Sequence, residues 1–289
     1  WLLCDNSLLA KVITEAIGDG WIRDAEQLRK LEDFADDTGF LESINDVKQI
    51  AKQRLLISLE RDVGLAYDPS ALFSAQCKRI HPYKRQVLHL LGVVWRYLRI
   101  RNGEQPARKR LHIFAGVASP SDHLAKQIIR LIHAVGELID RDAKAREWLR
   151  VLFVPGYGIT WAEKIMPAAE LAEEIATPNM EACGTTNFKM ALNGAVPIIS
   201  RAGANIELVE EIGEENMFVF GQTGKEIETS PDYNPSALLE KSDRLRAIFE
   251  FLEKEIVSVE RDETVLPLLS SLRYDDRYRV LVDLAPYME

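Results

Sequence analysis

The chain has 289 residues, of which 47% are hydrophobic and 28% are charged, enough for a sizeable buried core in one large or two modest domains. Its 45 acidic and 36 basic residues give a net charge of −9, which argues against nucleic acid as a partner. No apolar run approaches the ~18 residues of a membrane span. The three cysteines suggest neither a metal site nor a disulfide framework, so a reducing, cytoplasmic compartment fits.

Helical periodicity dominates the first 70 residues. LLAKVITEAIG repeats apolar residues at helical spacing and stops at Gly18 and Gly20, and two further helical stretches follow. The chain opens on WLLCDNSLLA, without Met or a charged leader, and we interpret this as the start of a fragment rather than a signal peptide.

Short apolar runs then alternate with helical stretches. The predicted strands are 72–76, 111–116, 151–156, 170–175, 196–200 and 217–221. The predicted helices between them are 82–102, 121–140, 159–167, 187–193 and 205–213. This alternation predicts an α/β fold with a doubly wound, mostly parallel sheet flanked by helices, which binds ligands beyond the carboxyl ends of its strands. A loop-rich segment, a charged helix over 241–259 and a final helical piece are expected after residue 221.

The first candidate site is KRIHPYKRQ, which follows the first predicted strand and opens a long helix. Its cationic residues are Lys78, Arg79, His81, Lys84 and Arg85. Cations at a helix N-terminus are unfavourable by about 0.3–1 kcal/mol each, and no usual capping residue is present. A bound anion would reverse this balance. The alternative is a solvated basic turn, but the position after a strand favours an anion site.

The second candidate site is EACGTTNFKM, residues 181–190. Gly184, Thr185 and Thr186 precede the helix that carries Lys189, and such small residues let backbone N–H groups approach a phosphate closely. Lys189, about one turn into the helix, suits either a charge contact to phosphate or a Schiff base with a phosphorylated aldehyde cofactor. The alternative is a capped helix with an exposed lysine. No GxxxxGK[ST] phosphate loop exists in the chain.

The two motifs together resemble those of the glycogen/starch (α-glucan) phosphorylases. That family carries V-K-R-I-H-E-Y-K-R-Q and E-A-S-G-T-G-N-M-K-F where this chain has CKRIHPYKRQ and EACGTTNFKM. The similarity continues through GYGITWAEKIMPAAELAEEIATPNMEA and weakens after about residue 222. The family has two Rossmann-like lobes in the glycosyltransferase-B arrangement, with the active site between them.

The resemblance implies that residues 1–289 are a single domain, the C-terminal, pyridoxal-phosphate-binding lobe of such an enzyme. Its parts would be a leading helical segment over 1–70, an α/β core over 71–221 and a loop-and-helix segment over 222–289, with the N-terminal lobe absent from this chain. The implied reaction is cleavage of terminal α-1,4-glucosyl residues of glycogen, starch or maltodextrin by orthophosphate. Its product is glucose 1-phosphate, its cofactor is pyridoxal phosphate, and the full-length enzyme would be a homodimer.

The resemblance also implies roles for individual residues. The implied catalytic residues are Lys189, Arg79 and Lys84. The implied cofactor-binding residues are Lys189, Lys78, Thr185, Thr186 and Tyr157. The implied substrate-binding residues are Glu181, Cys183, Gly184, Tyr83, Arg79 and Lys84. The sequence departs from the family pattern at Cys183 for Ser, Thr186 for Gly, Pro82 for Glu, Ala202 for Asp, and Gly158 for a basic residue.

Two other functions stay open at this point. One is a non-catalytic phosphorylase-like lobe that binds cofactor or sugar phosphate in a regulatory or assembly role. The other is a nucleotide-sugar glycosyltransferase of the same fold, against which Lys189 argues because such an enzyme needs no Schiff base. Since a fragment would supply one side of the interlobe cleft, we expect it to be inactive alone.

Overall fold

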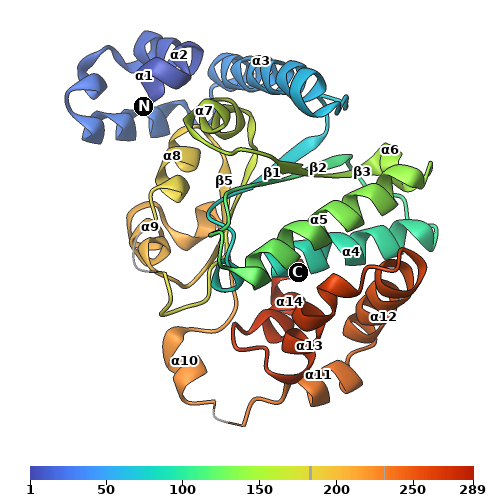
Figure 1. The fold of residues 1–289 in the computed structure, drawn as a ribbon. Helices are drawn as coiled ribbons and strands as arrows, with labels where there is room; N and C mark the ends of the chain where they lie inside the picture. Colours follow the sequence, from blue (N-terminus) through green and yellow to red (C-terminus); the bar gives the residue numbers. More distant parts are fainter. Residues whose placement is uncertain (182–183, 231) are drawn as a thin grey trace.

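The computed structural model describes residues 1–181, 184–230 and 232–289. Within them a six-stranded sheet has the order β3-β2-β1-β4-β5-β6, and every pairing is parallel (Figure 1). The strands are β1 (Leu72–Cys77), β2 (Arg110–Ala115), β3 (Leu149–Val154), β4 (Leu171–Glu174), β5 (Val196–Ser200) and β6 (Phe218–Phe220). Each overlaps a predicted strand, so the predicted α/β, parallel sheet is confirmed. The strand order reverses between β1 and β4, which makes their carboxyl ends the expected ligand site.

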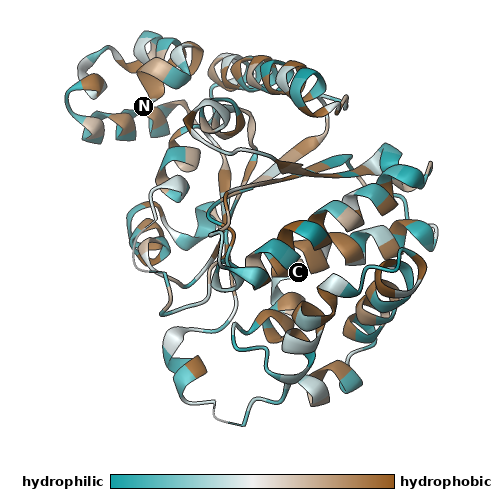
Figure 2. Cartoon of the chain, in the orientation of Figure 1, coloured by the Kyte–Doolittle hydropathy of each residue, from teal (hydrophilic) through white to brown (hydrophobic). Residues whose placement is uncertain are grey.

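Helices cover both faces of the sheet (Figure 1). One face packs against α3 (Thr38–Val63) and α7 (Ile159–Ala168) through a core that includes Leu55 and Leu59 of α3. The other face packs against α4 (Gln86–Arg101) and α5 (His123–Arg141). Burial on both faces explains why the strands are mostly apolar, and Figure 2 shows them as mostly hydrophobic while the surrounding helices carry mixed bands.

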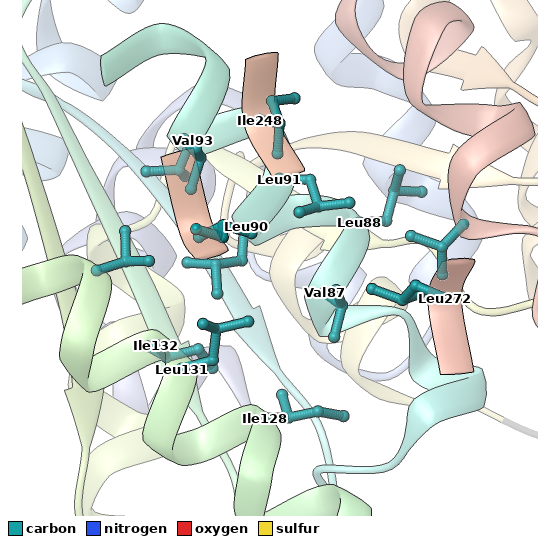
Figure 3. Packing of buried hydrophobic residues seen from close by; sticks show 14 of the residues in the cluster. Val87, Leu88, Leu90, Leu91, Val93, Ile128, Leu131, Ile132, Ile248 and Leu272 are labelled. Carbon is teal, nitrogen blue, oxygen red and sulfur yellow. The ribbon is translucent and has the colours of Figure 1, made fainter. Parts of the chain in front are cut away.

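The core under α4 also recruits the C-terminal helices. Leu88 and Leu91 of α4 share a cluster with Leu131 of α5 and with Ile248 and Leu272 from the end of the chain (Figure 3). The C-terminal segment therefore folds back onto the sheet layer instead of forming a separate core.

Short elements complete the chain. Before the sheet lie α1 (Leu2–Asp5), α2 (Ser7–Ile17), η1 (Gly20–Ile22) and η2 (Ala25–Phe34). Along the core lie η3 (Pro82–Lys84), α6 (Ala145–Trp148), α8 (Thr186–Leu192), α9 (Ala204–Ile212) and η4 (Glu214–Asn216). The last elements are α10 (Gly224–Glu228), α11 (Pro235–Lys241), α12 (Asp243–Phe251), η5 (Leu252–Val259), η6 (Glu263–Val265), α13 (Leu266–Tyr274) and α14 (Val280–Met288). None of the described helices is both long and apolar enough to cross a bilayer.

One predicted helix is interrupted. The sequence predicts a single helix over 82–102, but the structure has the short 3₁₀ helix η3, then Arg85 in a left-handed conformation at φ 56°, and only then α4. Left-handed backbone is uncommon outside glycine, so a strong side-chain interaction is expected to hold Arg85 there. That interaction is with the C-terminal helix α14 and is described below.

Candidate active site

The two candidate motifs leave the sheet side by side. Lys78 directly follows β1, and Glu181 lies in the segment that follows β4, the strand paired with β1 at the reversal of strand order. A Cβ atom built on Gly184 would lie 3.4 Å from Lys78 Nζ. The motifs that the sequence presents as two candidate sites are therefore one site, at the edge of the sheet where such folds bind ligands.

Four charged side chains form the centre of this site, which we call the lysine–glutamate quartet: Lys78, Lys84, Glu174 and Glu181. Lys78 Nζ lies 2.5 Å from Glu174 Oε2 and 3.6 Å from Glu181 Oε2, and Lys84 Nζ contacts the same Glu181 oxygen. All four side chains are nearly buried, with exposed fractions between 1% and 11%. The basic motif is thus not a solvated turn, because its lysines are drawn inward by carboxylates.

The environment of the quartet shifts two of its pKa values. Burial opposes the charged form of Lys78, but the carboxylates of Glu174 and Glu181 outweigh burial and raise its pKa. Burial raises the pKa of Glu174 in spite of the Lys78 ammonium beside it. Lys78 therefore stays protonated, while Glu174 is the carboxyl of the site that burial pushes toward its neutral form.

Two glycines let the backbone of the quartet pack closely. A Cβ on Gly116, just after β2, would lie 1.9 Å from the carbonyl oxygen of Lys78. A Cβ on Gly203, which has φ 53°, would lie 2.5 Å from the carbonyl oxygen of Glu181. Any side chain at either position would displace one half of the site, which explains glycine at both.

Arg85 faces a carboxylate of the protein itself and not the ligand anion that its place in the basic motif predicts. Its side chain is fully buried, its Nη1 lies 2.5 Å from Asp283 Oδ2 in α14, and its Nε donates to the Ile175 carbonyl at 2.6 Å. The prediction is wrong for this residue because its partners come from distant parts of the chain. Arg85 instead ties the basic motif to the segment after β4 and to α14.

A chain of buried neutral groups holds the backbone of Lys84. Gln76 Nε2 donates to the Lys84 carbonyl at 2.9 Å, Gln76 Oε1 lies 3.2 Å from His89 Nδ1, and His89 Nε2 lies 2.8 Å from His112 Nδ1. With this amide orientation, His89 donates from Nδ1 and accepts at Nε2 from His112. Burial lowers the pKa of His89 to about 3, so this series of hydrogen-bonded side chains stays uncharged near neutral pH.

Lys189 sits one turn into α8, as the sequence predicts. Its Nζ lies 4.6 Å from the centroid of the Trp1 ring, and no described carboxylate forms an ion pair with it. Asn187 Nδ2 donates to Asn205 Oδ1, and Asn205 Nδ2 donates to the Glu174 carbonyl, so α8 is fixed to the end of β4. Sequence reasoning missed Trp1, because nothing in a single tryptophan at the start of the chain signals a partner so far along it.

Arg79 and Tyr83 border the quartet on the side of the basic motif. Arg79 is exposed and has no ion-pair partner among the residues that the structure describes, which distinguishes it from the other cations of the motif. The Tyr83 ring lies under Lys84 Nζ at 4.7 Å, and the ring Nδ1 of His81 accepts from the Tyr83 N–H and caps η3. Arg79 is therefore the cation of the motif that is accessible from solvent.

The remaining predicted residues lie around the second motif. Thr185 precedes α8, is exposed and makes no side-chain capping bond, and Thr186 is the first residue of that helix. Tyr157 neighbours Cys77 and Glu174, and burial is the main cause that raises its pKa. Cys183 lies outside the described residues.

Comparison with known proteins assigns the chain to a family. The model of the carbohydrate phosphorylase family matches residues 1–289. The chain belongs to the carbohydrate phosphorylases. It is 39% identical to the muscle form of glycogen phosphorylase of Mus musculus, 38% to that of Homo sapiens and 38% to the glycogen phosphorylase of Chlamydia pneumoniae. Each match covers 100% of this chain but 35% of the relative.

Membership in the carbohydrate phosphorylases confirms the resemblance that the two motifs carry. The predicted connection with glycogen and carbohydrate metabolism is confirmed at the level of the family. This carbohydrate phosphorylase chain spans about a third of the length of the curated relatives it matches.

Proposed function

We propose that this chain is the C-terminal lobe of an α-glucan phosphorylase. In the complete enzyme it would help orthophosphate cleave terminal α-1,4-glucosyl residues of glycogen, starch or maltodextrin to glucose 1-phosphate, with pyridoxal phosphate as cofactor. The observation that carries the proposal is the packing of Lys78 against Gly184, which joins the two phosphorylase motifs into one site. The proposal includes an N-terminal lobe of the same enzyme, a homodimer and a cytoplasmic location.

The residues present fit pyridoxal phosphate. Lys189 offers an amine to the aldehyde, while Lys78, Thr185 and the backbone of Thr186 offer charge and donors to the phosphate. The Thr185 hydroxyl is not used in capping α8, and Lys78 Nζ lies 3.4 Å from a Cβ atom built on Gly184, so a donor and a positive charge are available to a phosphate there. When bound, the cofactor would supply a phosphate group able to exchange a proton with the substrate phosphate.

The other residues of the site have tasks that follow from their chemistry. Arg79 presents a planar guanidinium that suits two parallel hydrogen bonds to substrate phosphate. Lys84 adds a second positive charge, which Glu181 and the Tyr83 ring hold in place. The Glu181 carboxylate and the Tyr83 hydroxyl suit hydrogen bonds to glucose hydroxyls, and Gly184 lets the sugar approach the backbone.

Labelling of Lys189 tests the proposal. We expect borohydride treatment of the complete enzyme with pyridoxal phosphate, followed by peptide mapping, to leave a pyridoxyl group on Lys189. The Lys189→Arg variant keeps the charge and should not be labelled, because guanidinium does not form the linkage. A label on another lysine contradicts the assignment, and no label on the unsubstituted enzyme favours the non-catalytic alternative.

Substitution of Arg79 tests the phosphate contact. In the complete enzyme, Arg79→Ala should lower kcat/KM for phosphate by at least about tenfold, because a charge-assisted hydrogen bond contributes about 1.5–3 kcal/mol. Arg79→Lys keeps the positive charge but loses the planar guanidinium that can donate two parallel hydrogen bonds, so the decrease in kcat/KM should be smaller. Arg23→Ala removes another exposed arginine and serves as the control. Unchanged phosphate kinetics in Arg79→Ala, with normal cofactor content, would remove Arg79 from the site.

A further inference from the structure

Glu174 is a buried carboxylate whose ion-pair partner among the described residues is Lys78. It ends β4, its side chain is 1% exposed, and its Oε2 lies 2.5 Å from Lys78 Nζ. Apart from Lys78, no described residue donates a hydrogen bond to either oxygen. A buried carboxylate with so few donors is costly, so Glu174 depends on Lys78.

The quartet by itself has no net positive charge to offer a phosphate ligand. Two lysines and two carboxylates sum to zero, yet a phosphate dianion needs a positive site. A phosphate placed at Gly184 beside Lys78 would put a dianion and two carboxylates around the same two ammonium groups. Negatively charged groups this close together in a buried site do not all remain ionised. The most buried carboxylate is the one that is most readily protonated.

We propose that Glu174 takes up one proton from solvent when a phosphate group binds beside Lys78. The O–H bond forms on the Glu174 carboxylate, Lys78 is released to the phosphate, and no other bond changes. Glu174 is the proton acceptor because it is more buried than Glu181, at 1% against 8%, and because Glu181 keeps Lys84 as its partner. The inference rests on the proposed function, which supplies the phosphate.

The titratable and charged groups that face Glu174 come from several elements packed around it. They are Lys78 and Cys77 at the end of β1, Lys84 in η3, Tyr157 after β3, and Glu181 after β4. Lys78 has a raised pKa, burial raises the pKa of Cys77 to about 12, and burial raises the pKa of Tyr157 as well. Lys78 thus stays charged and these two neighbours stay neutral between pH 7 and 9, which leaves the carboxyls to respond to an incoming dianion.

Calorimetry in buffers of different ionisation enthalpy counts the protons taken up. Inorganic phosphate is titrated into the complete enzyme between pH 8 and 9, because orthophosphate loses its second proton at a higher pH than a phosphate ester, whose second pKa is about 6, and is a dianion only in this range. We expect uptake of close to one proton per phosphate bound, and therefore an affinity that falls by up to about tenfold per pH unit as pH rises. Glu174→Gln should remove both the uptake and the pH dependence while keeping the shape of the side chain.

Glu173→Gln is the matched control. Glu173 is equally buried in the same strand, but its carboxylate accepts from Ser74 and Tyr287 instead of facing Lys78. Burial raises its pKa to about 7, so it would reveal a general effect of buried carboxyls. Proton uptake on phosphate binding should persist in this variant. Uptake that is lost in Glu173→Gln, or kept in Glu174→Gln, overturns the inference.

Separate titrations distinguish the two possible sources of the phosphate group, the cofactor and the substrate. Pyridoxal phosphate and pyridoxal are titrated into cofactor-free enzyme, and inorganic phosphate into enzyme with and without cofactor. If pyridoxal phosphate causes proton uptake that depends on Glu174 and pyridoxal does not, the site binds the cofactor phosphate. If inorganic phosphate causes this uptake in enzyme that already holds the cofactor, the site binds the substrate phosphate. Binding without Glu174-dependent uptake overturns only this inference, whereas no binding in any titration overturns it together with the proposed function.

Discussion

Asp283→Ala is expected to lower the free energy of unfolding by about 3–5 kcal/mol, because it leaves a buried guanidinium without its counter-charge. Arg85 is fully buried, Asp283 is 1% exposed, and their closest atoms are 2.5 Å apart. Asp283 also accepts from the Gln222 N–H at 3.3 Å, so the pair joins the basic motif, the end of β6 and α14. Urea unfolding followed by circular dichroism measures the loss.

An exposed ion pair provides the comparison. Lys11 and Glu15 of α2 are 3.6 Å apart and 71% and 65% exposed, so Glu15→Ala should cost no more than about 1 kcal/mol. A similarly small effect of Asp283→Ala would contradict the view that this pair holds Arg85 in its left-handed conformation. Replacing both Arg85 and Asp283 with apolar residues should recover part of the stability, because no uncompensated charge remains.

The sheet was predictable because its signal is local. Parallel strands buried on both faces are mostly apolar runs, and the runs here are separated by helical stretches. The order of the strands was not predicted, so the carboxyl-end rule placed the basic motif after a strand but did not show that the second motif lies beside it. Lys189 was also placed correctly, because glycine and threonine before an apolar periodic stretch mark where α8 begins.

The charge balance of the site was not predictable, because its partners are far apart in the chain. The basic motif shows cations alone, while the carboxylate that contacts Lys84 is 97 residues away and the one that contacts Arg85 is 198 residues away. The break in the helix at Arg85 has the same origin. The sequence of residues 82–102 is helical throughout, and the left-handed residue is stabilised by the Ile175 carbonyl and by Asp283 in α14, both far from it in the chain.

Phosphorolysis by the 289-residue chain alone is expected to be several orders of magnitude slower than by the complete enzyme. On the proposed function, the glucan lies in a cleft between two lobes and this chain supplies one wall. Holding the reactants in place contributes much of such a barrier reduction, about 7–11 kcal/mol in well-oriented systems, and one wall cannot supply it. Arg79 and Thr185 are exposed to water here, so phosphate beside them would keep part of its hydration shell.

Release of glucose 1-phosphate from glycogen or maltodextrin measures the rate, with the complete enzyme at the same site concentration as the control. A comparable rate from the chain alone would show that one lobe suffices, while recovery of activity on adding the separately produced first lobe would support the two-walled site.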